Sequence, residues 1–192
     1  MIFAHDTEEG LASLAALINT RDGDVERLPD VAALDAFLHG GGWTGKRDRN
    51  DAELRAVRAL RPRLRRFWEL REDDVVALVN QLLREGRALP QLVKHDGWDY
   101  HLHATPSDAP LATRMAVEAA MAILDVVRTK ELSRLRLCDY PTCNNVLVDL
   151  TKNRSKRFCD VGCGNRAAVE AYRARQAKPA RARRARSGMR ER

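Results

Sequence analysis

Apolar residues recur at every third or fourth position over most of the chain before residue 130, which is the pattern of amphipathic helices. The predicted helices cover residues 8–19, 30–39, 51–68, 72–85 and 108–127. Asp30 is suited to cap the second helix, and the glycines at 40–42 end it. Pro62 is expected to kink or break the third helix. The last helix has the longest apolar stripe, so we expect it at the centre of a helical core.

The hydrophobic period changes between the fourth and fifth helices. Two runs of alternating residues around Asp96 and Gly97 predict a β-hairpin near residues 90–104. Its second strand is expected to point three side chains inward, namely Trp98, Tyr100 and Leu102. His101 and His103 could hold a metal, but no third ligand lies near them in sequence. Exposed polar side chains are therefore the preferred interpretation of both histidines.

A row of arginines accompanies the apolar stripe of the third helix, at positions 55, 58, 61, 65 and 66. Such a row can bind an anion. A solvated, salt-bridged helix face is the commoner meaning of the pattern and is preferred here.

All four cysteines lie in one short, basic and polar segment. They form two close pairs, Cys138 with Cys143 and Cys159 with Cys163, and fifteen residues separate the pairs. This spacing allows four thiolates to coordinate one Zn²⁺ tetrahedrally. Four thiolates leave no position for a water molecule, so the zinc is predicted to be structural. Free thiols or disulfides are the alternative, which the regular pairing disfavours.

The residues around the cysteines predict a metal-binding turn, a hairpin and a helix, an arrangement similar to a treble clef. The hairpin strands are expected at 146–148 and 156–158. Cys159 and Cys163 are expected at the first turn of a helix that runs to about Ala177, where the positive end of the helix dipole faces the thiolates.

Four residues of this helix have specific predicted roles. Gly164 leaves room beside the metal, and Asn165 can hydrogen-bond a thiolate or a nearby backbone group. Val169 and Tyr172 are predicted to pack the helix onto the hairpin.

The charge of the chain is distributed unevenly. From residue 151 onward there are fourteen Lys or Arg and three acidic residues, a net charge of +11, whereas the preceding part has 20 and 24, a net charge of −4. A strongly basic end of this kind most often meets nucleic acid or another polyanion, although a solvated tail is the alternative.

Six basic residues are the candidate contacts to nucleic acid: Arg154, Lys156, Arg157, Arg166, Arg173 and Arg175. Arg166 can instead offset the negative charge of the thiolates. Base contacts are expected from one helix face, at Arg166, Arg173 and Gln176. Pro179 and Gly188 argue against one unbroken helix, so residues 178–192 are predicted to be a disordered basic tail that adds salt-dependent phosphate affinity.

Several classes of protein are excluded or disfavoured by the sequence. No apolar run approaches the length of a membrane span. The first ten residues carry acidic side chains and no basic region, so they do not form a secretory signal, and a cytoplasmic location is expected. No nucleophile–base pair and no zinc-protease motif occurs, so we do not expect an enzyme.

The C-terminal motif extends beyond the cysteines to Asp149, Thr151, Asn153, Arg154, Ser155, Arg157, Phe158, Gly164, Asn165, Arg166, Ala171, Tyr172 and Arg173. With these residues the segment resembles the bacterial CGNR zinc-finger proteins. The N-terminal part is similar to the ABATE domain that accompanies this finger, through residues 17–20, 28–38 and 98–122. Residues 14–20 lack the Asp and the aromatic residue of the more usual Leu-Asp-Phe-Val-Asn-Thr motif.

The resemblance implies a stress-induced transcription regulator that binds DNA through its zinc finger. The expected fold is mainly α with a small β-hairpin. A helical ABATE-like domain covers residues 1–132, a treble-clef-like four-cysteine zinc finger covers 136–177, and the basic tail follows. The helical domain is expected to sense a small-molecule effector or to form a homodimer, although no heptad seam requires one. The alternative is an RNA- or protein-binding adaptor in which the zinc is purely structural.

Overall fold

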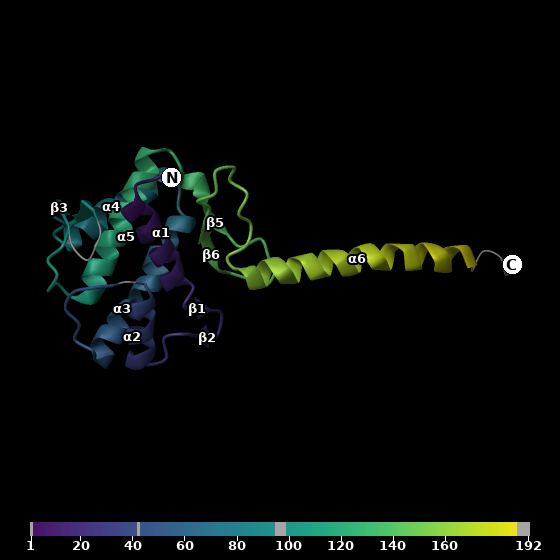
Figure 1. Cartoon of the computed structure of the whole chain (residues 1–192), viewed down its shortest axis with the longest axis horizontal. Coiled ribbons are helices and arrows are strands. Elements are labelled where there is room, and N and C mark those ends of the chain that lie inside the picture. The colour runs from purple at the N-terminus through teal and green to yellow at the C-terminus, as the bar shows by residue number, and fades with distance from the viewer. Residues whose placement is uncertain (1, 42, 95–98, 188–192) are drawn as a thin grey trace.

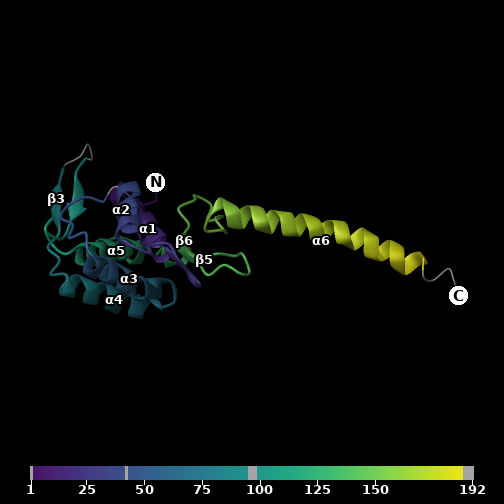
Figure 2. The same ribbon diagram turned by 90° about the horizontal axis from the view of Figure 1, so that it is seen from below.

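The computed structural model describes residues 2–41, 43–94 and 99–187, with side chains described up to residue 177. A helical body lies beside a small hairpin unit, and a long helix projects away from both (Figures 1 and 2). The helices are α1 (His5–Ile18), α2 (Val31–Gly40), α3 (Asp51–Arg65), α4 (Glu72–Glu85), α5 (Leu111–Arg128) and α6 (Val161–Ser187), with the 3-10 turns η1 (Arg66–Trp68) and η2 (Leu132–Arg134). The strands pair as antiparallel hairpins, β1 (Arg21–Asp22) with β2 (Val25–Glu26), β3 (Gln91–Val93) with β4 (His101–His103), and β5 (Leu135–Leu137) with β6 (Val146–Val148). The predicted mainly helical fold class is confirmed.

Helix α5 lies at the centre of the body, as its long apolar stripe predicts, and packs against α1, α3 and α4. Leu11 of α1, Val57 of α3 and Ile123 of α5 have no exposed surface. Full burial of such a side chain stabilises the fold by about 1.5–3 kcal/mol. At the end of α4, a Cβ atom on Gly86 would lie 2.2 Å from Val117 Cγ2, so only glycine allows the chain to pass α5 this closely.

Polar caps define where two of the helices begin. Asp30 caps α2 as predicted, because its Oδ1 accepts a hydrogen bond of 2.8 Å from the Ala33 amide. Asn50 caps α3 in the same way through the Glu53 amide, at 2.9 Å. Helix α3 then continues through Pro62, so the expected break does not occur. Apolar side chains on both sides of this proline pack in the core and hold the helix together.

As predicted, Arg55 and Arg66 of the arginine row on α3 are exposed, and Arg65 pairs with Glu69 at 3.0 Å. Arg58 and Arg61 instead bind within the protein. Arg61 is only 6% exposed, and its guanidinium donates hydrogen bonds of 2.7 and 2.6 Å to Glu26 and one of 3.1 Å to Thr20 Oγ1. Hydrogen bonding to this guanidinium lowers the pKa of Glu26 to about 2. Arg58 donates to the carbonyl of Leu28. The side of α3 that carries these residues therefore fixes the β1–β2 segment to the body.

The β3–β4 hairpin forms as predicted, but its faces are reversed. Tyr100 and Leu102 are 70% and 44% exposed, whereas His101 and His103 are half-buried with their Nε2 atoms 3.0 Å apart. The predicted facing is therefore wrong, because the imidazoles turn toward a polar cavity against α1 and α5. Trp98 and the predicted turn lie outside the described residues.

The β5–β6 hairpin shares the hydrophobic core of the helical body. Val146 and Val148 are buried among the core residues. The side chain of Asn19, just after α1, donates to the Val146 carbonyl at 2.8 Å and accepts from the Val146 amide at 2.9 Å. Trp68 Nε1 donates to the Leu147 carbonyl at 2.9 Å. The Asn19 side chain thus satisfies the Val146 amide and carbonyl, which face away from β5, and Trp68 adds a bond to a neighbouring β6 carbonyl.

The strand partner of β6 differs from the prediction. Strand β6 pairs with β5, with Leu137 opposite Val146, whereas the sequence predicted pairing with residues 156–158. Those residues form no strand, although the Arg157 carbonyl accepts a hydrogen bond of 2.9 Å from the Asp139 amide. The true partner precedes the first cysteine, where the alternation of Leu135, Arg136 and Leu137 is a strand signal that the prediction did not use.

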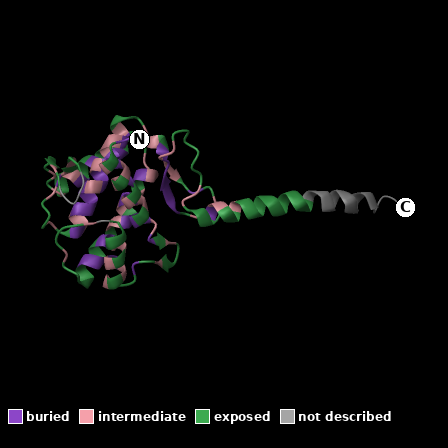
Figure 3. Ribbon diagram, viewed as in Figure 1, coloured by how far each residue is buried: buried purple, intermediate pink, exposed green. Residues whose placement is uncertain are grey.

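Helix α6 extends beyond its predicted end near Ala177 and passes through Pro179 to Ser187. Alanine and arginine, which favour helices, dominate this stretch. Every residue from 168 to 177 is exposed (Figure 3). Disorder of the tail in solution stays a prediction, and residues 188–192 lie outside the described part. Among the described helices, none combines the length and the apolar character needed to cross a membrane.

The buried ion pair between α3 and β2 generates a stability prediction. Glu26→Gln is expected to lower the free energy of unfolding by about 2–3 kcal/mol at pH 7, because it leaves the Arg61 guanidinium buried without its counter-charge. The pKa of Glu26 is lowered in the folded state, so its contribution is present above the unfolded value of 4.5 and is lost as the pH falls toward 2. Urea denaturation of the two proteins should therefore give stabilities that converge at low pH.

A matched control is the pair formed by Arg63 and Glu85, which has the same bidentate geometry at 2.6 and 2.8 Å but lies at the surface. Glu85→Gln is expected to change the stability little, because solvent screens exposed ion pairs. An equal loss of unfolding free energy in Glu26→Gln and Glu85→Gln would contradict the importance of the pair between Arg61 and Glu26.

Candidate metal centre

The four cysteine sulfur atoms converge at one end of the hairpin unit, all within 4.8 Å of one another. The Sγ atom of Cys159 lies 3.7 Å from that of Cys143 and 3.7 Å from that of Cys163. A tetrahedral ion with metal–sulfur bonds of about 2.3 Å places its ligands roughly 3.8 Å apart, whereas a disulfide bond measures about 2.0 Å. All four cysteines are free thiols. The geometry therefore fits one tetrahedral Zn²⁺ and excludes the disulfide alternative.

The first cysteine pair lies on a tight turn that follows β5. The Cys138 amide donates to the Asn145 carbonyl at 2.9 Å and closes the loop between the strands. Within that loop the Cys143 amide donates to the Tyr140 carbonyl at 2.9 Å. These backbone bonds point both thiols toward the same side of the hairpin.

The second pair lies on either side of the start of α6, as the sequence predicts. Cys159 precedes the helix, and its amide donates to the Sγ atom of Cys138 at 3.4 Å. Cys163 is inside the first turn, and its amide donates to Asp160 Oδ1 at 2.7 Å. Asp160 is thus the N-cap of α6. This cap was not predicted, because the helix was expected to have Cys159 in its first turn, whereas α6 begins at Val161.

Two of the four thiols lie where burial disfavours their thiolate form. Burial raises the pKa of the Cys143 thiol to about 11 and also raises the pKa of Cys159. Metal ligation requires thiolates, so a divalent cation supplies the charge that keeps the sulfur atoms deprotonated. With four protein ligands the ion has no open coordination position, and its role would be to hold the segment folded.

Arg166 contacts the metal centre directly. Its Nη2 atom donates to Cys163 Sγ at 3.0 Å, and its guanidinium carbon lies 4.6 Å from the centre of the Tyr140 ring. The Tyr140 hydroxyl in turn donates to Glu170 at 2.7 Å. Of the two roles that the sequence left open for Arg166, the geometry favours the thiolate contact. Tyr140 and Glu170 were not predicted to take part.

The asparagine whose side-chain amide contacts a cysteine sulfur is Asn145 and not the predicted Asn165. Asn145, which is buried, donates from Nδ2 to Cys159 Sγ at 3.6 Å. Asn165 is exposed and makes no hydrogen bond through its side chain to the described residues. A Cβ atom on Gly164 would lie 3.5 Å from Phe158, an ordinary contact, so space alone does not require glycine there.

A buried aspartate organises the loop that returns the chain to the second cysteine pair. Asp149 has no exposed surface, and its carboxylate accepts hydrogen bonds of 3.0 Å from the amides of Thr151 and Lys156. Arg134 donates to the Asp149 carbonyl at 2.7 Å. Burial alone would raise the pKa of Asp149, but the hydrogen bonds that its carboxylate accepts from the Thr151 hydroxyl and from the amides of Thr151 and Lys156 lower it. The carboxylate is therefore ionised and acts as a structural anchor.

Apart from Arg166, the predicted nucleic-acid contacts fall into two groups. Arg154 donates to Glu131 at 2.9 and 3.0 Å, and Arg157 pairs with Asp139 at 2.8 Å, so both are engaged inside the protein although they remain partly exposed. Three others are exposed and make no ion pair with any described residue, namely Lys156, Arg173 and Arg175.

Val169 and Tyr172 do not pack helix α6 onto the hairpin as predicted. They are 48% and 56% exposed. The prediction is wrong because α6 leaves the finger after its first turns and projects away from both the hairpin and the body (Figure 1).

The sulfur geometry predicts the behaviour of a ligand variant. Cys159→Ser is expected to release the metal and to remove amide protection from residues 156–166, while α5 and β6 stay protected because the body's core holds them. Hydrogen exchange of the two proteins measures this difference. Chelation of the wild type should reproduce the same pattern, and stoichiometric metal in the purified variant would contradict the ligand assignment.

The contact of Arg166 with a ligand sulfur predicts a second effect. Arg166→Ala is expected to weaken zinc binding roughly 10- to 100-fold, as changes to groups that support metal ligands commonly do. Competition with a chromogenic chelator measures the affinity. Arg173→Ala, further along the same helix, is the matched control and should leave zinc affinity unchanged. Equal affinities for all three proteins would show that Arg166 does not support the metal.

Comparison with known families gives matches to two separate segments of the chain. Residues 134–176 match the family model of the CGNR zinc finger. Residues 12–130 match the ABATE family model, described as "Putative stress-induced transcription regulator". A comparison with curated proteins finds no match. The resemblance seen in the sequence is confirmed, and the chain belongs to the ABATE family and carries a CGNR zinc finger after the ABATE segment.

Proposed function

We propose that the protein is a DNA-binding transcription regulator of the cytoplasm, in which the zinc finger presents α6 to the DNA backbone and grooves. The observation that carries this proposal is the set of exposed basic side chains without ion pairs among the described residues, at Lys152, Lys156, Arg173 and Arg175. The acidic residues nearby are already engaged, since Asp160 caps α6 and Glu170 accepts from Tyr140. The cationic surface is therefore not neutralised within the protein.

The shape of α6 supports the same function. With 27 residues the helix is about 40 Å long. It is exposed on all sides from residue 168 to 177 and lies clear of the body (Figures 2 and 3). The major groove of DNA is about 12 Å wide and admits one helix. The body carries a net charge of −4 before residue 151, which would keep it away from the phosphates and direct the basic end toward them.

A protein-binding adaptor is the second candidate, and the exposure of Val169 and Tyr172 on α6 favours it. Apolar side chains on an exposed helix gain from burial against a partner. DNA binding is preferred because basic residues outnumber these two apolar ones along the same helix and flank them in sequence.

The proposal is tested by fluorescence anisotropy with labelled duplex DNA over a salt series. Arg173→Ala/Arg175→Ala is expected to weaken binding and to reduce the slope of log Kd against log salt by about 0.9 for each phosphate that the variant no longer neutralises. Arg55→Ala/Arg84→Ala removes two exposed arginines from α3 and α4 and is the matched control, which should bind like the wild type.

Competition between genomic fragments of the host and random duplex then decides the function. A regulator requires some fragment to outcompete random DNA by a wide margin. If no fragment does so, or if both double variants lose affinity equally, the proposal fails and the adaptor is favoured.

A further inference from the structure

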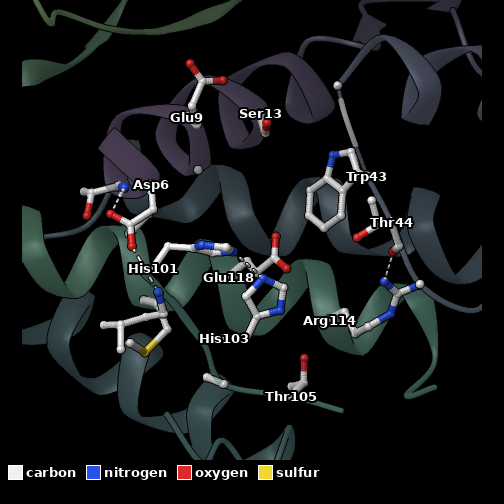
Figure 4. Close-up of a pocket in the computed structure, with 18 of the residues that line it drawn as sticks. Asp6, Glu9, Ser13, Trp43, Thr44, His101, His103, Thr105, Arg114 and Glu118 are labelled. Atoms are coloured by element: carbon white, nitrogen blue, oxygen red, sulfur yellow. Dashed lines mark hydrogen bonds between the residues drawn. The ribbon is translucent and has the colours of Figure 1, made fainter. Parts of the chain in front are cut away.

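A cavity of about 240 Å³ lies in the helical body, away from the zinc finger (Figure 4). Helices α1 and α5 form two of its walls, β4 forms a third, and the segment around Trp43 forms the fourth. The volume corresponds to roughly eight water molecules, enough for a small organic molecule on the order of ten heavy atoms. Figure 4 shows the Trp43 ring and the imidazoles of His101 and His103 on opposite sides of the space around Glu118.

The lining of the cavity is strongly acidic. Four of its described side chains are carboxylates, at Asp6, Glu9, Glu118 and Asp125, and the one Lys or Arg among them is Arg114. Each nitrogen of the Arg114 guanidinium donates to a backbone oxygen, at the carbonyls of Ala109, Thr44 and Lys46. Arg114 thus fixes a wall of the cavity.

The carboxylates differ in how far the protein satisfies them. Asp6 accepts hydrogen bonds from the amides of Thr7 and Leu102, at 2.9 and 3.3 Å, and Asp125 accepts from the Thr7 hydroxyl at 2.7 Å. Glu9 is exposed at the rim. Glu118 lies on the central helix, is half-buried and, unlike Asp6 and Asp125, makes no hydrogen bond to any described residue.

Burial raises the pKa of Glu118 to about 7, because the low-dielectric surroundings disfavour its charged form and the charge of Arg114 only partly offsets this. The charged groups that share the cavity are Arg114 and Asp125 on α5, Asp6 and Glu9 on α1, and the imidazoles of His101 and His103 on β4. An incoming cation would restore the ionised form of Glu118. An incoming anion would meet a net negative wall.

We infer that this cavity binds a small organic amine, whose ammonium group pairs with Glu118 and whose apolar part lies against the ring of Trp43. A charge-assisted hydrogen bond in a desolvated site supplies the specificity for a cation. The aromatic face adds a favourable cation–π and apolar contact. Trp43 is itself packed against the hydrophobic core, so its ring is held in place before the ligand enters.

The position of the cavity connects it to the zinc finger. The first part of α1 lines the cavity at Asp6, Thr7, Gly10 and Ser13, and Asn19 just after the same helix holds strand β6. A bound amine would therefore contact the element that positions the finger. This link makes the amine an effector only if the proposed regulator function holds; amine binding itself is independent of it.

The experiment uses the zinc-loaded full chain and three probes with the same aromatic body: phenethylamine, 2-phenylethanol and 3-phenylpropionate. Isothermal titration calorimetry at pH 8 should show binding of the amine, with the neutral alcohol and the anionic acid at least tenfold weaker. Glu118→Gln should lower the affinity for the amine roughly 10- to 100-fold, which corresponds to the loss of one charge-assisted hydrogen bond. Asp74→Asn, an exposed acidic residue of α4 outside the cavity, should bind the amine like the wild type. Amine affinity of the wild type should fall between pH 8 and pH 6 as Glu118 becomes protonated.

Melting temperatures of the wild type and of Glu118→Gln keep the test decisive. Glu118→Gln removes a buried charge, so its Tm should exceed that of the wild type, and by more at pH 8 than at pH 5.5, which also shows that the variant folds. No amine binding at millimolar concentration, equal binding of all three probes, or full amine affinity in Glu118→Gln would each overturn the inference. Amine binding without DNA binding would leave the cavity assignment standing and remove the regulator, whereas DNA binding without amine binding would do the reverse.

Discussion

The convergence of four sulfur atoms is the constraint on which the C-terminal third of the protein depends. Between the first and last cysteine the chain buries little apolar surface beyond strand β6, and its loops are shaped by Asp149 and by backbone hydrogen bonds. Such a segment does not offset its own loss of conformational entropy, and a metal ion held by the four thiolates would supply the missing free energy. Because Cys163 belongs to α6, the same ion would fix where the basic helix begins. The thiolates thus set both the fold of the finger and the origin of its charged surface.

The finger and the helical body are joined through backbone groups of one short strand. Asn19 and Trp68 bond to β6, and the side chains of Val146 and Val148 complete the core under α1. The polar pair of Arg61 and Glu26 fixes the neighbouring β1–β2 segment beside the same end of α1. Helix α1 is therefore held at one end by the finger, while its other end borders the cavity. This arrangement gives the two family segments one continuous packed interior.

Local rules predicted much of this structure, and their failures share a cause. Cysteine spacing predicted the ligand cluster, and the cap at Asp30 followed from residue type alone. Alternation located the β3–β4 hairpin but could not decide which face meets the body, so Tyr100 was placed inside. The partner of β6 and the exposure of Tyr172 depend on how distant elements pack, which periodicity does not encode. Arg61 was assigned to solvent because its charge is visible in the sequence and its pairing with the distant Glu26 is not.

The junction at β6 limits how far the zinc finger can be treated as a module. A finger excised at the boundary of its family match would carry Val146 and Val148 into water and lose the side chains that complete the hydrogen bonding of β6. Transplanting it to an unrelated scaffold would require a receiving surface shaped like the end of α1 together with η1. Helix α6, by contrast, touches little beyond its first turns, so its exposed face is the portion that evolution or an engineer can rewrite without disturbing the rest.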